Sequence, residues 1–182
     1  MSRKPQNSAN RPCQLFEFLL QTRGGIQVVT YTIPGEDADR LAKLFGDYDS
    51  RANRQFMEIP LVNGRVVLLN LSFLIGAFRL NVVGRMGDQD RQPVNDHESG
   101  VELQDWQSLS NSAHPPDLAL LINGLEEPLI CRELAREVIA LAAMVLQEEP
   151  ATEMVTFTDE ENLRTRYIST EKIILMESIE YH

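Results

Sequence analysis

Residues 56–70 read FMEIPLVNGRVVLLN, two apolar runs joined by the dipeptide Asn63-Gly64. Asn-Gly suits a two-residue type I′ turn, so this stretch predicts a β-hairpin. Residues 154–169 read MVTFTDEENLRTRYIS, again two strand-like runs, here joined by an acidic turn. The two stretches lie at similar places in the two halves of the chain, which points to an internal duplication.

The first half begins with a strand–turn–strand pattern that leads into a helix. Apolar residues 15–21 and the β-branched stretch 26–33 flank Arg23-Gly24-Gly25, whose glycines suit a tight turn. After an acidic first turn, apolar residues then recur at helical spacing over 38–48. A hairpin and a helix are therefore expected before the 56–70 hairpin.

The second half repeats this order. Residues 118–122, the turn Asn123-Gly124 and residues 128–131 predict a hairpin. Residues 134–146 follow with apolar side chains on two neighbouring lines of a helix. A helix that is apolar over so much of its circumference is expected to be central, packed against a sheet or against the other half.

These patterns together predict an α+β fold. We expect two hairpin–helix–hairpin units with one main helix each, largely antiparallel sheets and a pseudo-twofold relation. The units would span 13–83 and 117–182 and form one compact body. Residues 1–12 are expected to be a disordered tail, and 84–116, rich in polar residues, Gly and Pro, a linker or insert.

Composition excludes several classes of protein. The chain has 182 residues and a formal net charge of −10, which disfavours general nucleic-acid binding because phosphate contacts need a positive field. Cys13 and Cys131 form no CxxC motif, which favours a reduced, cytoplasmic protein. The most apolar window, 66–80, is shorter than the roughly 20 residues of a membrane-spanning helix.

The usual signs of catalysis are missing. His97 and His114 lie in the expected linker and His182 is the last residue, so no expected helix or strand carries a histidine. Residues 159–161 are adjacent acids on an expected hairpin tip, where neighbouring side chains diverge and do not form a calcium loop. We therefore expect no enzyme activity, no metal and no cofactor.

One string resembles a ligand-binding family. Arg51 and Arg54 precede Asn70-Leu71-Ser72, with Gly76 further on, which resembles the PilZ family and its RxxxR and [DN]xSxxG motifs. The resemblance implies binding of cyclic di-GMP through Arg51, Arg54, Asn70 and Ser72, since arginine forks suit phosphates. Here the spacings are RxxR and NxSxxxG, each differing by one residue. A structural turn shared with Ile168-Ser169 is the alternative.

A second resemblance concerns topology. The strand, Asn-Gly, strand pattern at 59–78 and again from 118 is similar to small flagellar FlbD-type proteins of bacteria. It implies a short β-meander with a helix and carries no catalytic residues. This resemblance therefore bears on the topology of a bacterial-type protein and not on its function.

Two further features have a structural and a binding interpretation. Arg164 and Arg166 lie on one face of an expected strand, where they would hold an anion or pair with carboxylates such as Glu177 or Glu180. Trp106, the single tryptophan, lies in the linker and either covers the domain's own surface or docks on a partner.

The expected function is therefore binding or scaffolding. The chain would act through protein–protein contacts or by self-association as a homodimer, because unpaired strand edges must be covered. The alternative is a module that senses a cyclic dinucleotide or a similar anionic ligand.

Overall fold

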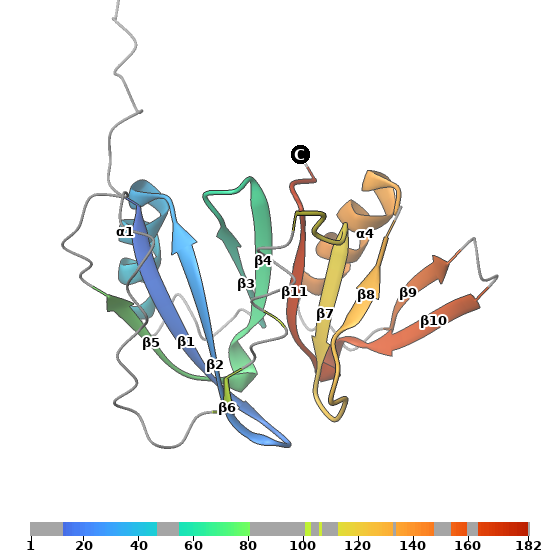
Figure 1. The fold of residues 1–182 in the computed structure, drawn as a ribbon, viewed down its shortest axis with the longest axis horizontal. Helices are drawn as coiled ribbons and strands as arrows, with labels where there is room; N and C mark the ends of the chain where they lie inside the picture. The colour runs from blue at the N-terminus through green and yellow to red at the C-terminus, as the bar shows by residue number, and fades with distance from the viewer. Residues whose placement is uncertain are drawn as a thin grey trace, which may run out of the picture.

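The fold is shown in Figure 1, a computed structural model. It describes residues 13–46, 55–80, 101–102, 106, 113–132, 134–147, 154–159 and 164–181. Within these residues it is a mixed α+β structure with two α-helices and three sheets. Arg51, Arg54, the expected tail 1–12 and most of the expected linker 84–116 lie outside the described residues.

The first half contains the expected hairpins and helix. In chain order the elements are β1 Gln14–Thr22, β2 Gly25–Ile33, α1 Gly35–Gly46, β3 Phe56–Pro60, β4 Arg65–Asn70, the 3₁₀ turn η1 Leu71–Phe73 and β5 Leu74–Leu80. Gly25 and Gly64 have φ values of 115° and 75°, which explains the glycines at the two hairpin turns.

The second half repeats the same order after the short strand β6 Val101–Glu102. Its elements are β7 Leu118–Ile122, β8 Leu129–Cys131, α4 Arg136–Gln147, β9 Met154–Asp159, β10 Arg164–Ser169, the 3₁₀ turn η2 Thr170–Lys172 and β11 Ile173–Ile179. Both halves therefore run strand, strand, helix, strand, strand, 3₁₀ turn, strand.

The sheets join strands from distant parts of the sequence. One sheet has the order β5-β1-β2-β6, and a second has the order β3-β4-β11-β7-β8. The hairpin β9–β10 forms a third sheet with two strands. All pairs are antiparallel except β2 with β6. The five-stranded sheet thus contains strands of both halves, joined where β4 pairs with β11.

Two apolar cores lie on the two faces of this central sheet. Val67 and Leu69 of β4 belong to the core under α1, whereas Leu68 belongs to the core under α4. This division follows from the alternation of side chains along a strand. Every residue of β4 is buried, so β4 is fully enclosed by its two neighbouring strands and two cores.

Helix α4 is less enclosed than its composition suggests. It buries one side, with Ile139 and Leu146 fully covered, but Leu141 and Met144 are 62% and 59% exposed. The expected packing against a sheet is observed on one side of α4, while Leu141, which was expected on an apolar line of the helix, is exposed. Apolar residues on two lines of the helix do not specify two buried contacts, and only one sheet face is available to it.

No helix among the described residues has both the length and the apolar character needed to cross a membrane.

Candidate functional site

Asn70 and Ser72, the described part of the PilZ-like string, lie at the junction of the two halves. The Asn70 side chain is fully buried; its Nδ2 donates to the Ile173 carbonyl oxygen at 2.9 Å. Its Oδ1 accepts a hydrogen bond from the Ser72 backbone nitrogen at 3.0 Å and caps η1. Asn70 thus fastens the end of β4 to the start of β11, a structural role.

The matching turn of the second half is η2. Because η1 and η2 each stand directly before the last strand of their half, Leu71 corresponds to Thr170. The expected match of Leu71-Ser72 with Ile168-Ser169 is therefore shifted by two residues along the chain. Ser169 takes the place of Asn70, and Ser72 is exposed on the surface. Arg51 and Arg54 lie outside the described residues, so the grouping of these residues into a ligand site stays a prediction.

Trp106 is packed into the protein's own core. Its side chain is 1% exposed and belongs to the apolar cluster under α1. The indole Nε1 donates a hydrogen bond of 2.6 Å to the Tyr31 hydroxyl. This position corresponds to the self-packing alternative, since a docking residue would have to leave this site to meet a partner.

The Tyr31 hydroxyl lies beside a buried ion pair that joins the two halves. Arg65 of β4 donates from Nε to Glu177 Oε1 of β11 at 2.8 Å, and from Nη2 to the Pro116 carbonyl at 2.7 Å. The Tyr31 hydroxyl lies 3.4 Å from Glu177 Oε2. Arg65 and Glu177 are 5% and 1% exposed, so this network holds the two halves together out of contact with water.

The environment of Tyr31 keeps its hydroxyl protonated. Burial raises the pKa of Tyr31 well above 10.0, and the negative charge of Glu177 raises the pKa further. A phenol in this state donates a hydrogen bond and is no general base at neutral pH. Sequence reasoning missed this network because 112 positions separate Arg65 from Glu177. Glu177 was named with Glu180 as an example of a carboxylate that would pair with Arg164 or Arg166, and in the structure Glu177 forms a salt bridge with Arg65.

A cleft of about 500 Å³ lies between the tips of two hairpins. It is lined by the β1–β2 turn and the β7–β8 turn, which lie at the same end of the molecule (Figure 1). The Arg23 backbone nitrogen donates to Asn123 Oδ1 at 2.9 Å and links the turns. Gln27 Oε1 is buried in this region and has no hydrogen-bond partner in the described part of the chain. The cleft thus offers one buried acceptor to a small polar molecule.

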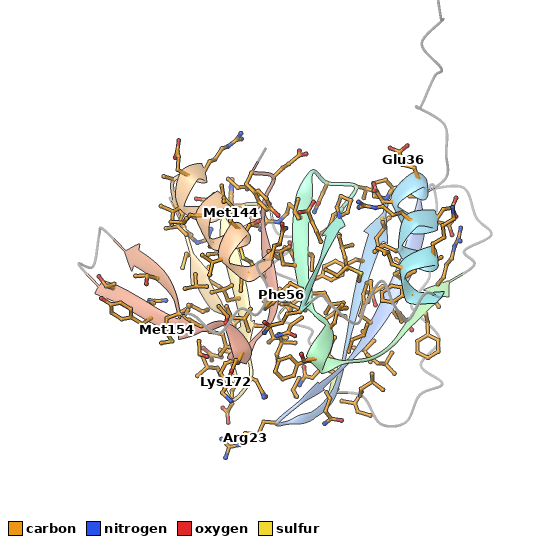
Figure 2. All side chains as sticks on the ribbon, turned by 180° about the vertical axis from the view of Figure 1, so that it is seen from behind. Arg23, Glu36, Phe56, Met144, Met154 and Lys172 are labelled. Atoms are coloured by element: carbon orange, nitrogen blue, oxygen red, sulfur yellow. The ribbon has the colours of Figure 1, made fainter. Side chains whose placement is uncertain are left out.

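The most exposed apolar side chains of the strands lie on two sheet edges. Met154 of β9 and Tyr167 of β10 are 52% and 67% exposed, on a hairpin that projects from the rest of the protein (Figures 1 and 2). Ile75 and Phe78 of β5 are both 52% exposed. Within the described residues, β5 pairs only with β1 and β10 only with β9. Each strand thus has one open edge beside exposed apolar residues.

Comparison with known proteins adds no family to this description. No protein-family model, no curated protein and no solved structure matches the chain significantly. Within the described residues no three His, Cys, Asp or Glu side chains form a group that could hold a metal ion. The two open edges and the cleft are therefore the candidate sites, and their geometry alone carries the assignment.

Proposed function

We propose that this protein is a non-catalytic binding or scaffolding protein that acts through the open edges of its sheets. The observation that carries the proposal is the projecting β9–β10 hairpin with Met154 and Tyr167 exposed. A two-stranded sheet is marginally stable alone in water, and open edges with apolar side chains attract further strands. A protein chain that adds to this hairpin would stabilise it.

Helix α4 supports the same proposal. Leu141 and Met144 are one helical turn apart and are exposed in the same half of the molecule as Met154 (Figure 2). Apolar groups gathered on a surface are typical of protein-binding sites. The corresponding side of α1 carries Arg40 and Lys43, so this apolar surface belongs to the second half alone.

We also propose that the two halves arose by duplication and are related by a pseudo-twofold axis. The shared order of elements supports this. So does the pairing of the second hairpin of each half, which begins with Phe56 opposite Asn70 and with Met154 opposite Ser169. Asn70 and Ser169 each stand directly before the 3₁₀ turn of their half. A cytoplasmic location remains part of the proposal.

Sedimentation of the full chain tests this function. Wild type at micromolar to millimolar concentration is expected to form a complex with itself, most simply a homodimer. Met154→Lys with Tyr167→Lys is expected to weaken the complex, because two charges would have to be buried. Val62→Lys is the matched control, since Val62 is 43% exposed on the β3–β4 hairpin, away from both edges. A monomer at every concentration, with no partner bound, would refute the proposal.

A second candidate function is the sensing of a small anionic ligand. In the cleft, the buried Gln27 Oε1 has no partner among the described residues and would accept a hydrogen bond from an N–H or O–H group of the ligand, whereas the PilZ-like string places the anionic groups of the ligand near Arg51 and Arg54. Calorimetry with cyclic di-GMP separates these sites. Binding that is lost in Arg54→Ala but kept in Gln27→Leu indicates the PilZ-like site, and the opposite pattern indicates the cleft. No heat with wild type excludes this ligand.

A further inference from the structure

The open edges of β5 and β10 have matching positions in a strand pair that the chain already forms. In the central sheet, the last strand of the second half, β11, pairs with β4 of the first half. By the order of elements, β5 corresponds to β11 and β10 corresponds to β4. The pair β5 with β10 would therefore repeat the pair β11 with β4.

This repeated pair is not formed within one chain. β5 lies at one end of the long axis of the molecule and β10 at the other (Figure 1). The two edges face different neighbours, and neither is the neighbour of the other in any sheet. We propose that β10 of one copy adds to the open edge of β5 in a second copy. The proposal rests on the proposed binding function and specifies its partner and surface.

The register of this contact follows from the register inside the chain. Corresponding strands differ by the same number of positions: 164 − 65 = 99 for β10 and β4, and 173 − 74 = 99 for β11 and β5. The observed pairs are Leu69 with Leu175, Leu68 with Met176 and Val67 with Glu177. Shifted by 99, they become Ile168 with Gly76, Tyr167 with Ala77 and Arg166 with Phe78 of the second copy.

The side chains at these positions suit one another. Ala77 is small and lies on the α1 side of β5, opposite Phe18 of β1, so a large Tyr167 side chain beside it would extend the core under α1. Phe78 is on the other side of the strand, where it would meet Arg166. A guanidinium over an aromatic ring is a favourable pair, and Tyr167 would cover apolar surface that is now exposed.

The contact is head-to-tail. Each copy has one β5 edge and one β10 edge at opposite ends of its long axis, so two copies joined by one contact keep one edge of each kind open, and further copies add in the same way unless the assembly closes into a ring. The sheets would then continue from one copy into the next, as the central sheet already continues from one half into the other.

Disulfide trapping tests the register directly. In a Cys13→Ser, Cys131→Ser background, a chain with Ala77→Cys is mixed with a chain with Tyr167→Cys and oxidised. Directly opposite residues in an antiparallel pair lie within disulfide reach, so a covalent dimer of the two chains is expected. The matched control pairs Ala77→Cys with Arg166→Cys, whose side chains would lie on opposite faces of the sheet and are expected to crosslink much less.

A charge reversal at Phe78 gives a second test without oxidation. In the proposed register, residue 78 faces Arg166 of the second copy, so a carboxylate there would be attracted and an ammonium repelled. Phe78→Glu is expected to keep the association between copies, while Phe78→Lys is expected to raise its Kd about ten-fold or more. Phe78 is 52% exposed, so both variants should fold.

The outcomes separate this inference from the proposed function. Crosslinking of 77 with 167, together with the Glu and Lys difference, supports the contact. Crosslinking that is equal or stronger in the control pair overturns the contact, and so does an equal loss of association in Phe78→Glu and Phe78→Lys. In both cases the protein still self-associates, so the proposed function is kept. A wild-type chain that stays monomeric and gives no crosslink overturns the contact together with self-association.

Discussion

The buried ion pair between Arg65 and Glu177 makes a sharp prediction about stability. Arg65→Met keeps most of the apolar stem and removes the guanidinium. The Glu177 carboxylate then loses its 2.8 Å salt bridge, and the Pro116 carbonyl loses its 2.7 Å hydrogen bond. Because Glu177 is 1% exposed, bulk water does not replace the lost partner without opening the core.

The expected loss is large compared with the stability of a small protein. Removing one partner of a buried pair costs about 3–5 kcal/mol, which includes a carbonyl left without its donor. The free energy of unfolding of a typical domain is about 5–15 kcal/mol. Arg65→Met is therefore expected to be strongly destabilised, and Arg65→Lys, which keeps the charge but loses the two-armed geometry, to lie between it and wild type.

Urea unfolding, followed by circular dichroism, measures these differences. Arg40→Met is the matched control, because the Arg40–Asp37 pair is a surface pair within α1 and Arg40 is 55% exposed. Its loss should cost at most about 0.5 kcal/mol. The double variant Arg65→Met, Glu177→Met removes both charges, and an apolar replacement of a buried pair is often close to neutral. It should therefore be more stable than Arg65→Met alone.

Two results would refute this reasoning. One is an Arg65→Met variant that loses no more free energy of unfolding than Arg40→Met. The other is a double variant that loses as much free energy of unfolding as Arg65→Met and Glu177→Met lose together, or more. Because the two residues interact, the loss in the double variant must be smaller than this sum.

Three further predictions follow from the same region. Asn70→Ala should cost about 2–3 kcal/mol in urea unfolding because it removes two hydrogen bonds of a buried side chain, while the exposed Ser72→Ala should cost less than about 0.5 kcal/mol. The fluorescence of Trp106, 1% exposed, should resist acrylamide quenching until the protein unfolds; quenching equal to that of the unfolded chain would contradict its burial. The raised pKa of Tyr31 means that the folded state holds its proton longer, so the free energy of unfolding should be constant near neutral pH and fall above about pH 10, less steeply in Tyr31→Phe.

The elements of the fold were predictable because their signals are local. Asn63-Gly64 and Asn123-Gly124 specify turns whose glycines have positive φ, and the hairpins around them are observed. The helical spacing after residue 35 likewise predicted α1, which is observed over Gly35–Gly46, while the last two expected positions lie outside the described residues. In each case neighbouring residues decide the outcome, and no distant contact is needed.

The pairing of the halves was not predictable in this way. The contact of β4 with β11 depends on which strand edges meet, and strand alternation alone does not specify a partner. The same holds for Arg65 and Glu177, which read as ordinary surface charges in the sequence. Trp106 offered a signal, since a single tryptophan beside apolar residues is a good core residue, but nothing nearby in sequence identified Tyr31 as its partner.

Asn70 shows why the ligand-like motif was ambiguous. A side chain that accepts from a backbone nitrogen two residues on is typical of structural turns, and it uses the same residue types that bind ligands. Its second hydrogen bond, to Ile173, is 103 positions away and becomes visible only in the fold. The arginines that would distinguish the two roles lie outside the described residues, so the cyclic dinucleotide hypothesis stays a prediction.

The proposed contact between copies differs from the internal one at its most important positions. Shifted by 99, Arg65 corresponds to Arg164 and Glu177 to Phe78, so an arginine is kept and the buried acid becomes an exposed aromatic residue. Opening the internal junction would expose β4 and β11 residues of both apolar cores to water, which makes this junction permanent. Separating two copies would only return Phe78 and Tyr167 to the half-exposed or exposed state that they have in a single copy, which costs less free energy. The same strand geometry would thus serve a fixed joint inside the chain and a reversible one between chains.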